Sequence, residues 1–395
     1  MKIVMVPSGF KECLDAEEVA LAMERGAKRF DRKADVEIVP MIDGGEGFAK
    51  TIIRLKAGKI IYREVTGPVG EKILSHFGIF VENGKKIAVI EMAAVAGLKL
   101  VPRHQRNPLE TTTYGVGELI LSALDLGVDQ ILFGCGDSGT SDGGVGMAQA
   151  LGAQFLDTRS KPIQVRSVVD LMKVRHIDTS FLDKRLSTVP IDVACNWKNL
   201  LCGDKGVARV FGPQKGATPE QVELLSEALD HYAALIKKTV ALDVRYLPGS
   251  GASGGLGAGL IAFAGATLYP RFEIIKNYIQ IEEKIRNADV VFTAEGSLDF
   301  QTPNGKIPSE VARIAKKHHI PVIAITGTIG QGAELNYNAG IDAYLSIIPK
   351  PTTLEKAMIN APKWIEDSTE AALRQVSIGL TIAKRISSLK GVLQK

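Results

Sequence analysis

The feature that most constrains this chain is a glycine-rich segment lying between an apolar run and a helical pattern. Residues 129–133 are typical of a buried strand, and residues 147–151 of the first turns of a helix. Between them, residues 134–146 carry glycines, hydroxyls and two carboxylates. Such a turn lets the backbone approach an anion and direct N–H groups at it, next to a helix N-terminus. It predicts an α/β fold with a ligand-binding loop; a tight structural turn with solvated aspartates is the alternative.

Candidate side chains within this segment follow from residue type. Asp137 and Asp142 have carboxylates that suit a divalent cation, or acceptance of a proton from an attacking hydroxyl. Ser138 is a candidate ligand contact, and the N–H groups of Gly143 and Gly144 are candidates to cradle phosphates. The segment matches neither the dinucleotide fingerprint nor the P-loop pattern.

Length and composition bound the remaining possibilities. At 395 residues the chain favours two domains. The net charge of +4, from 48 basic and 44 acidic residues, gives no strong field for nucleic acid. The four cysteines lack zinc-type spacing and are interpreted as reduced thiols of a cytoplasmic protein. The uncharged glycine-interrupted stretch at 246–270 is a poor membrane span, so we expect no membrane partner.

Polar or glycine-rich loops follow several other expected strands. Carboxyl ends of strands are where open α/β sheets bind ligands. We expect charged groups there to handle phosphates, protons or metal, with solvated surface roles as the alternative; they are Lys11, Asp43, Lys215, Glu295, Asp299 and Lys306. Gly254 and Gly255 lie in a further glycine-rich loop. Repetition of this arrangement favours phosphoryl transfer from a nucleotide to a small acceptor.

Helix boundaries are also predicted from the sequence. Asp15, with Glu18 three residues later, forms a capping-box pattern before a helix ending at Phe30. Thr218 and Pro219 have the residue types of a second helix start. Residues 111–113, including Thr112, either contact a substrate or cap the helix that follows. Two helices, 353–363 and 368–388, are expected to close the chain.

Five strings then identify a resemblance to the bacterial type-I glycerate kinase family. They span residues 43–47, 107–118, 211–219, 254–259 and 299–306, and the resemblance covers nearly the whole chain. It implies transfer of phosphate from ATP, with Mg²⁺, to a glycerate hydroxyl, C2 being favoured over C3. It also implies a Rossmann-like domain built from both ends of the chain, enclosing a β-richer α/β domain, with the ligand cleft between them. We set the boundaries at 1–65 with 286–395, and 66–285.

Residue roles follow from the same reasoning. Catalytic groups are expected at Asp142, Asp43 and Lys11, and metal ligands at Glu295 and Asp299. Substrate and nucleotide contacts are expected at Thr112, Asp137, Ser138, Gly143, Gly144, Lys215, Gly254, Gly255 and Lys306. The partners implied are ATP and a small hydroxy acid, with the protein as a monomer or homodimer.

Four places depart from the family pattern, all in segments expected to line the cleft. Ser8 replaces an aspartate and Ser297 an arginine. In the central segment Asp137 replaces a glycine, and changes also occur at Gly139 and Ser141. Asn304 stands where a histidine is common. These departures leave two alternatives open: a kinase for a related four-carbon or tartronate-like acid, and a ligand-binding homologue without catalysis.

Overall fold

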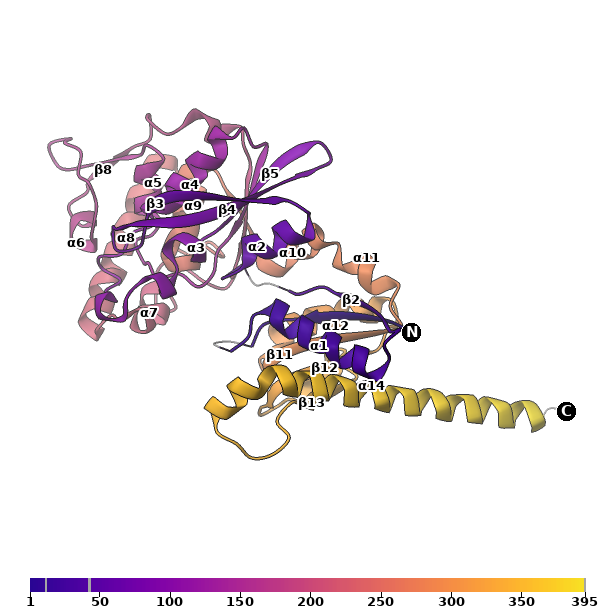
Figure 1. Ribbon diagram of the computed structural model, residues 1–395. Helices are drawn as coiled ribbons and strands as arrows, with labels where there is room; N and C mark the ends of the chain where they lie inside the picture. The colour runs from indigo at the N-terminus through magenta and orange to yellow at the C-terminus, as the bar shows by residue number, and fades with distance from the viewer. Residues whose placement is uncertain (11–12, 42–43, 394–395) are drawn as a thin grey trace. The chain divides into compact units, whose positions relative to one another are not determined.

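The computed structural model describes residues 1–10, 13–41 and 44–393, and the side chains up to residue 387. It divides into two compact units, Met1–Ile42 with Ile279–Lys395, and Asp43–Tyr278. The α/β class expected from the sequence is confirmed (Figure 1). Strand β3 (Lys59–Thr66) pairs with β4 (Lys72–Glu82) and so belongs to the second unit.

The first unit is built on a five-stranded parallel sheet. Its strands are β1 (Lys2–Pro7), β2 (Asp35–Ile38), β11 (Val290–Leu298), β12 (Val322–Ile329) and β13 (Ala343–Ser346), in the order β13-β12-β11-β1-β2. Adjacent strands pair in parallel, so their carboxyl ends share one edge. The first and last strands of the chain therefore share one sheet. In this doubly wound order the direction of winding reverses between β1 and β11, where such sheets bind ligands.

Helices cover the two faces of this sheet. α1 (Ala16–Phe30) packs with α14 (Leu354–Leu393), and α12 (Ile307–Lys317) contacts β1, β11 and β12 with α11 (Ile281–Arg286) beside it. The capping box predicted at Asp15 and Glu18 is present. Gly26 permits the close approach of α1 to α14, because a Cβ there would lie 2.3 Å from the carbonyl oxygen of Glu366. The unit also contains α13 (Leu335–Asn338) and the short helix η5 (Thr302–Asn304).

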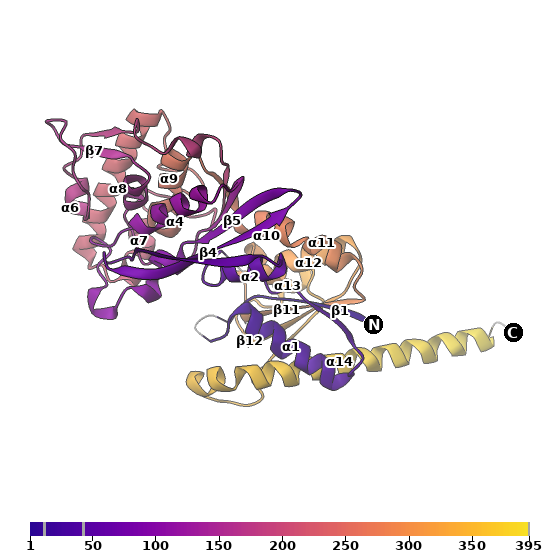
Figure 2. The same cartoon turned by 45° about the horizontal axis from the view of Figure 1, so that its top comes forward.

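The end of the chain differs from the prediction of two closing helices. α14 is a single helix with Pro362 inside it. Proline lacks the N–H that would bond to the carbonyl four residues earlier, that of Met358. The Cys13 thiol donates a hydrogen bond of 3.4 Å to this oxygen. The thiol is a weak substitute donor for this carbonyl. Figures 1 and 2 show its last turns extending clear of the sheet of its own unit.

The second unit is built on a six-stranded mixed sheet. The additional strands are β5 (Lys85–Glu91), β6 (Gln130–Gly134), β9 (Ile191–Cys195) and β10 (Thr267–Pro270), in the order β10-β9-β6-β5-β4-β3. The first four strands in this order run parallel, whereas β4 and β3 are antiparallel additions. A separate antiparallel pair consists of β7 (Gln154–Leu156) and β8 (His176–Asp178). The sheet places the carboxyl ends of β5, β6 and β9 along one edge.

The helices of this unit follow the expected loops. They are α2 (Phe48–Leu55), α3 (Ala93–Ala96), α4 (Tyr114–Asp125), α5 (Val145–Ala150), α6 (Val168–Leu171), α7 (Val207–Phe211), α8 (Pro219–Val240), α9 (Ala252–Ala264) and α10 (Arg271–Ile279). Short 3₁₀ turns η1–η4 span Leu98–Leu100, Arg103–Gln105, Lys184–Ser187 and Pro213–Lys215. Thr218 caps α8 as predicted, with Gln221 completing a capping box. Apolar side chains of α4, α5 and α9 join the core that includes β6 and β9.

Candidate functional site

The central loop is the connection from β6 to α5, residues 135–144. Gly143 and Gly144 have φ angles of 67° and 82°. Such left-handed conformations favour glycine. They turn the chain sharply into α5, whose first residue is Val145. The predicted strand, glycine-rich turn and helix are therefore all present, although α5 begins two residues earlier than the 147–151 pattern indicated.

The second predicted glycine pair packs directly on this loop. The Gly254 carbonyl accepts a hydrogen bond of 3.0 Å from the Gly143 N–H. Ser253, Gly254 and Gly255 have consecutive positive φ angles of 53°, 71° and 90° within α9. A Cβ on Gly254 would lie 1.9 Å from the Thr140 carbonyl oxygen. Close packing against the central loop thus explains Gly254 independently of any phosphate.

Asp142 ties the central loop to the start of α4. Its carboxylate accepts hydrogen bonds of 2.8 Å from both the backbone N–H and the hydroxyl of Thr113. It also accepts bonds from the N–H groups of Gly144 and Gly146, at 3.1 and 3.0 Å. Burial raises the pKa of Asp142 above its ordinary value, and these donors act in the opposite direction. The carboxylate therefore already orders the loop before any substrate binds.

Lys215 lies inside the unit, directly against the central loop. Its side chain is 3% exposed, and its Nζ donates hydrogen bonds of 2.8 Å to the Ser138 hydroxyl and 2.5 Å to the Thr140 carbonyl. The Ser141 hydroxyl is 3.5 Å away. Burial lowers the pKa of Lys215 to about 7, against the attraction of Asp142, which raises it. This predicted ligand contact is thus occupied in holding residues 138–141.

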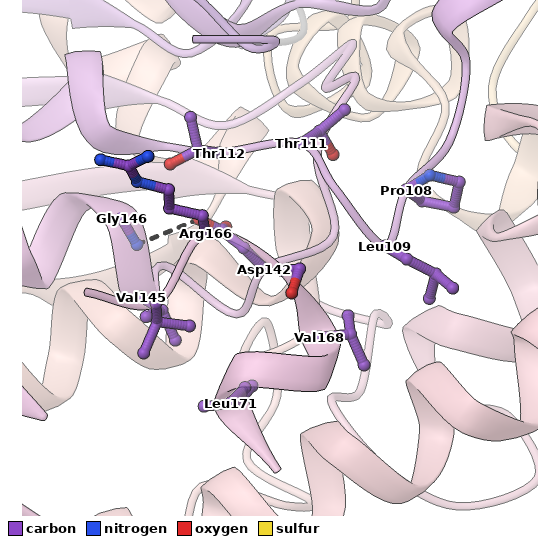
Figure 3. A pocket seen from close by; sticks show the side chains of 12 residues that line it. Pro108, Leu109, Thr111, Thr112, Asp142, Val145, Gly146, Arg166, Val168 and Leu171 are labelled. Carbon is purple, nitrogen blue, oxygen red and sulfur yellow. Dashed lines mark hydrogen bonds between the residues drawn. The ribbon is translucent and has the colours of Figure 1, made fainter. Parts of the chain in front are cut away.

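A small pocket lies beside the loop (Figure 3). Thr112, predicted as a ligand contact, lines it together with Asp142 and Arg166. Figure 3 marks the hydrogen bond from Gly146 to Asp142 at this pocket. The Thr112 hydroxyl accepts a bond of 3.1 Å from the N–H of Tyr114 at the start of α4. Thr112 consequently supports the helix start and also lines a pocket, so its position is compatible with both interpretations.

A second glycine-rich loop, residues 44–47, lies against the central loop. The Glu46 N–H donates to the Asp137 carboxylate at 3.0 Å. A Cβ on Gly136 would lie 2.6 Å from the Cα of Gly45, so the two backbones nearly touch. The exposed Lys99 pairs with Glu46 at 2.6 Å. The structure therefore brings Asp137 beside a loop that is 91 positions away in sequence.

Glu91 is a residue that the sequence reasoning missed. It ends β5, is 2% exposed, and accepts hydrogen bonds from the N–H groups of Gly47 (3.1 Å) and Ala49 (2.6 Å). Burial raises its pKa to about 7, although these two donors act to lower it. No motif surrounds Glu91; a carboxylate ending an apolar strand was the available signal. It holds the 44–47 loop at the start of α2.

The first unit carries its own polar cluster after β11. Lys306 lies 3.7 Å from the Glu295 carboxylate and 3.3 Å from that of Asp299. Its Nζ is also 3.4 Å from the Ser297 carbonyl. Burial alone would raise the pKa of Asp299, but hydrogen bonds from Gln301 and Lys306 outweigh it and lower the pKa. The three predicted residues are therefore brought together.

The carboxylates of this cluster suit Mg²⁺ in a nucleotide complex. Kinase sites hold Mg²⁺ through one or two carboxylates plus substrate phosphates. Glu295 and Asp299 supply two such groups around one lysine. Within the described residues, no group of three or more His, Cys, Asp or Glu side chains is arranged to hold a metal. Lys11 and Asp43, both predicted as catalytic, lie outside the described residues.

The departures from the family pattern take different structural roles. Asp137 has a φ of 49°, a backbone conformation natural for the glycine that it replaces. The Ser8 hydroxyl donates to the Ala294 carbonyl at 2.8 Å, next to Glu295. Gly139 is buried, and a Cβ there would lie 2.6 Å from a methyl carbon of Val101. Only glycine fits this position without movement, which explains the absence of the usual alanine.

Comparison with known proteins defines the class. A sequence profile of the glycerate kinase family matches residues 3–377. The glycerate 2-kinase of Escherichia coli K12 is 43% identical over 98% of this chain and 99% of its own length. The glycerate kinase of Haemophilus influenzae is 46% identical over 88% of this chain and 91% of its own.

A solved structure gives the same result. A protein of Salmonella typhimurium LT2, provisionally identified as glycerate kinase 2, superposes with a TM-score of 0.83 at 44% identity. The match covers 96% of this chain and 99% of that one. Fold, glycine-rich loops and relatives define a small-molecule kinase. The chain belongs to the glycerate kinase family.

Proposed function

We propose that this protein is an ATP-dependent glycerate kinase that phosphorylates the C2 hydroxyl of glycerate. The observation that carries the proposal is the match over 98% of the chain to an enzyme named glycerate 2-kinase. The small-molecule partners are ATP and the hydroxy acid, and we place the reaction in the cytoplasm. Within the described part of the chain, no helix has the length and apolar character to cross a membrane.

The central loop is a positioning element in this proposal. In phosphoryl transfer, the protein mainly positions the reactants and stabilises charge on the transferred group. The N–H groups of Gly143 and Gly144, predicted to cradle phosphates, already bond to the Gly254 carbonyl and the Asp142 carboxylate. This left-handed turn therefore shapes the loop, and other groups would have to contact the phosphates. Lys215 and Asp142 keep the loop in place through its side chains and N–H groups. We assign both residues to positioning rather than to direct phosphate contact.

The alternative role of Asp142 as catalytic base is less favoured by its contacts. Oδ2 accepts three hydrogen bonds, whereas Oδ1 accepts one. Only Oδ1 therefore retains clear capacity to accept a proton from an acceptor hydroxyl. Lys11 and Asp43 remain candidate catalytic groups.

The cluster after β11 takes the charged part of the nucleotide complex. Mg²⁺, when bound, neutralises charge on the transferring phosphates. Glu295 and Asp299 would hold it directly or through water, and Lys306 would contact phosphate oxygens. Lys306 pairs with both carboxylates, and it would be free to contact phosphate oxygens if Glu295 and Asp299 held the metal instead.

A more hydroxylated acid is the second candidate substrate. The observation favouring it is Asp137, an exposed carboxylate on the central loop where the family pattern has glycine. Carboxylates accept hydrogen bonds from sugar-like hydroxyls. Ser297 also removes the arginine that would hold a substrate carboxylate in a bidentate manner. A longer acid therefore remains in the proposal as an alternative.

Product analysis tests the function directly. The full chain is incubated with ATP, Mg²⁺ and D-glycerate, and the product is examined by ³¹P NMR. We expect a single phosphomonoester coupled to the one proton on C2. Coupling to two methylene protons would place the phosphate on C3 and contradict the C2 assignment. ATP consumption that no three- or four-carbon hydroxy acid increases would favour a non-catalytic homologue.

A further inference from the structure

The last turns of α14 expose apolar side chains that no described part of the first unit covers. The proximal part of the helix packs on α1, with Ile365 and Leu373 fully buried. Beyond residue 377 the exposure changes: Ile378 is 61% exposed, Ile382 53% and Ile386 49%. Figures 1 and 2 both show this yellow end extending clear of the sheet and helices of its unit. The family match also ends at residue 377.

Three isoleucines lie along one side of this part of the helix, whereas Leu380, which is 52% exposed, lies on the other side. Ile378, Ile382 and Ile386 recur every four residues, so they align along a single stripe. Helical spacing places Lys384 on the opposite side and Arg385 at the flank of the stripe. From residue 378 to 393 the sequence contains three basic residues, Lys384, Arg385 and Lys390, and no acidic one. The segment thus combines an apolar stripe with charges that are all positive.

Such a helix is not stable by itself in water. Isolated helices of this length are marginal, and this one includes Gly379 and several β-branched residues that lower helix propensity. No described heavy atom of a neighbouring element lies within 4 Å of the position that a Cβ on Gly379 would take. A surface that accepts both isoleucines and positive charge would stabilise it.

A second copy of the same segment meets only half of this requirement. Pairing of two distal helices would bury the isoleucine stripes, but each segment 378–393 would bring three basic residues and no acidic one. Like charges on adjacent helices oppose association. An anionic lipid surface accepts both features, because the apolar face enters the headgroup boundary while Lys and Arg side chains meet the phosphates.

We propose that residues 378–393 of α14 form an interfacial anchor that binds anionic membrane surfaces. The helix lies in the plane of the surface and does not span it. This association would hold the enzyme at a membrane reversibly, since a single short amphipathic helix gives modest affinity. The expectation of no membrane partner rested on the absence of a membrane-spanning stretch in the sequence, and the proposed association does not need one.

Vesicle co-sedimentation of the full chain tests the proposal. Vesicles of phosphatidylcholine alone are compared with vesicles of phosphatidylcholine mixed with phosphatidylglycerol. We expect binding to the mixed vesicles to be at least about tenfold tighter, and to weaken as salt rises. Equal binding to both compositions, or binding to neither, would overturn the anchor.

Variants separate the stripe from the charge. Ile382→Asp should lose vesicle binding, whereas Ile359→Asp, at a 72% exposed site on the proximal part of the same helix, should retain it. The double variant Lys384→Glu with Arg385→Glu should lose only the preference for phosphatidylglycerol. Unchanged kinase activity and thermal unfolding confirm that each variant is folded; the charge variant carries the test if Ile382→Asp fails this check.

Sedimentation equilibrium without vesicles tests the alternative that a second copy of the chain covers the isoleucine stripe. We expect the wild-type chain and Ile382→Asp to have the same oligomeric state. A dimer that dissociates in Ile382→Asp, together with no vesicle binding by the wild-type chain, would show that a second copy covers the stripe.

Discussion

The buried ammonium group of Lys215 lies 2.8 Å from the hydroxyl oxygen of Ser138, so a side chain from one loop supports the interior of another. Ser138 precedes the left-handed turn at Gly143 and Gly144, and Lys215 also bonds to the Thr140 carbonyl between them. Removing this amine would leave buried acceptors without a donor, which typically costs about 1–3 kcal/mol each. Lys215 is accordingly placed to set the shape of the central loop.

Substituting Lys215 by methionine should lower kcat by about two orders of magnitude, because the loop loses its internal support. It should also change the pH dependence of stability. The unfolded chain keeps this proton up to about pH 10.5, whereas the folded chain releases it near 7. Wild-type stability therefore gains from this site as pH rises between these values. Denaturant unfolding across this pH range should show that Lys215→Met loses the rise in stability. Lys205→Met, at an exposed site, should keep it. An unchanged pH dependence of stability in Lys215→Met would contradict the buried role of Lys215.

For Glu91 we expect the opposite effect of pH on folding stability, at acidic pH. Its pKa rises from 4.5 unfolded to about 7 folded, so the folded chain binds the extra proton. The contribution of Glu91 to stability should fall as pH increases from about 4.5 to 7. Glu91→Gln should remove this fall and weaken the 44–47 loop. Thermal unfolding at several pH values measures the pH dependence of stability, and hydrogen exchange at the Gly47 and Ala49 amides measures the protection of the 44–47 loop. If Glu91 only filled space in the core, Glu91→Gln would change neither quantity.

Asp137 should affect substrate use more than stability. Asp137→Asn keeps a side-chain oxygen for the Glu46 N–H and tolerates the left-handed backbone, so we expect stability within about 0.5 kcal/mol of wild type. Loss of the charge should change KM for hydroxy acids, with a smaller effect on KM for ATP. Steady-state kinetics with each substrate varied in turn measure both values. A large loss of stability with unchanged KM would instead make Asp137 a structural clamp.

Gly26 offers a test of the first unit. Alanine there would place Cβ 2.3 Å from the Glu366 carbonyl oxygen and 2.9 Å from the Thr369 Cβ. Overpacking of this kind costs typically about 1–3 kcal/mol. Gly379→Ala is the matched control on α14, where a Cβ meets no described neighbour within 4 Å and helix propensity improves by up to about 1 kcal/mol. In denaturant unfolding we expect the midpoint to fall for Gly26→Ala and to rise for Gly379→Ala. Equal shifts of the two midpoints would contradict the close approach of α1 to α14.

The sequence predicted those features that depend on local chemistry. The capping box of Asp15 with Glu18 and the helix start at Thr218 and Pro219 depend on residues close in the sequence, and both are present. The contact between Asp137 and Glu46 depends on how β6 and the 44–47 loop meet in space, and no local pattern contains it. Glu91 was missed for the same reason. The continuous α14 was also missed; its proximal part packs on α1, near the other end of the chain, and no local pattern contains this contact.

The site predictions also divide into features that residue type indicates and contacts that depend on the folded chain. Residue type indicated which side chains carry charge near glycine-rich loops, and Lys306 does gather Glu295 and Asp299. Residue type could not show that the Lys215 amine is directed at loop oxygens, or that the Asp142 carboxylate binds N–H groups. The assignment of Lys215 required the folded positions of segments 75 residues apart.

The most direct test of the central claim is a comparison of kcat/KM among D-glycerate, L-glycerate, tartronate, erythronate and threonate in an ATP-coupled assay. The glycerate kinase assignment predicts the highest value for D-glycerate, with ³¹P NMR showing phosphate on C2. A four-carbon acid turned over far more efficiently than D-glycerate would contradict it, and would direct attention first to Asp137 and Ser297.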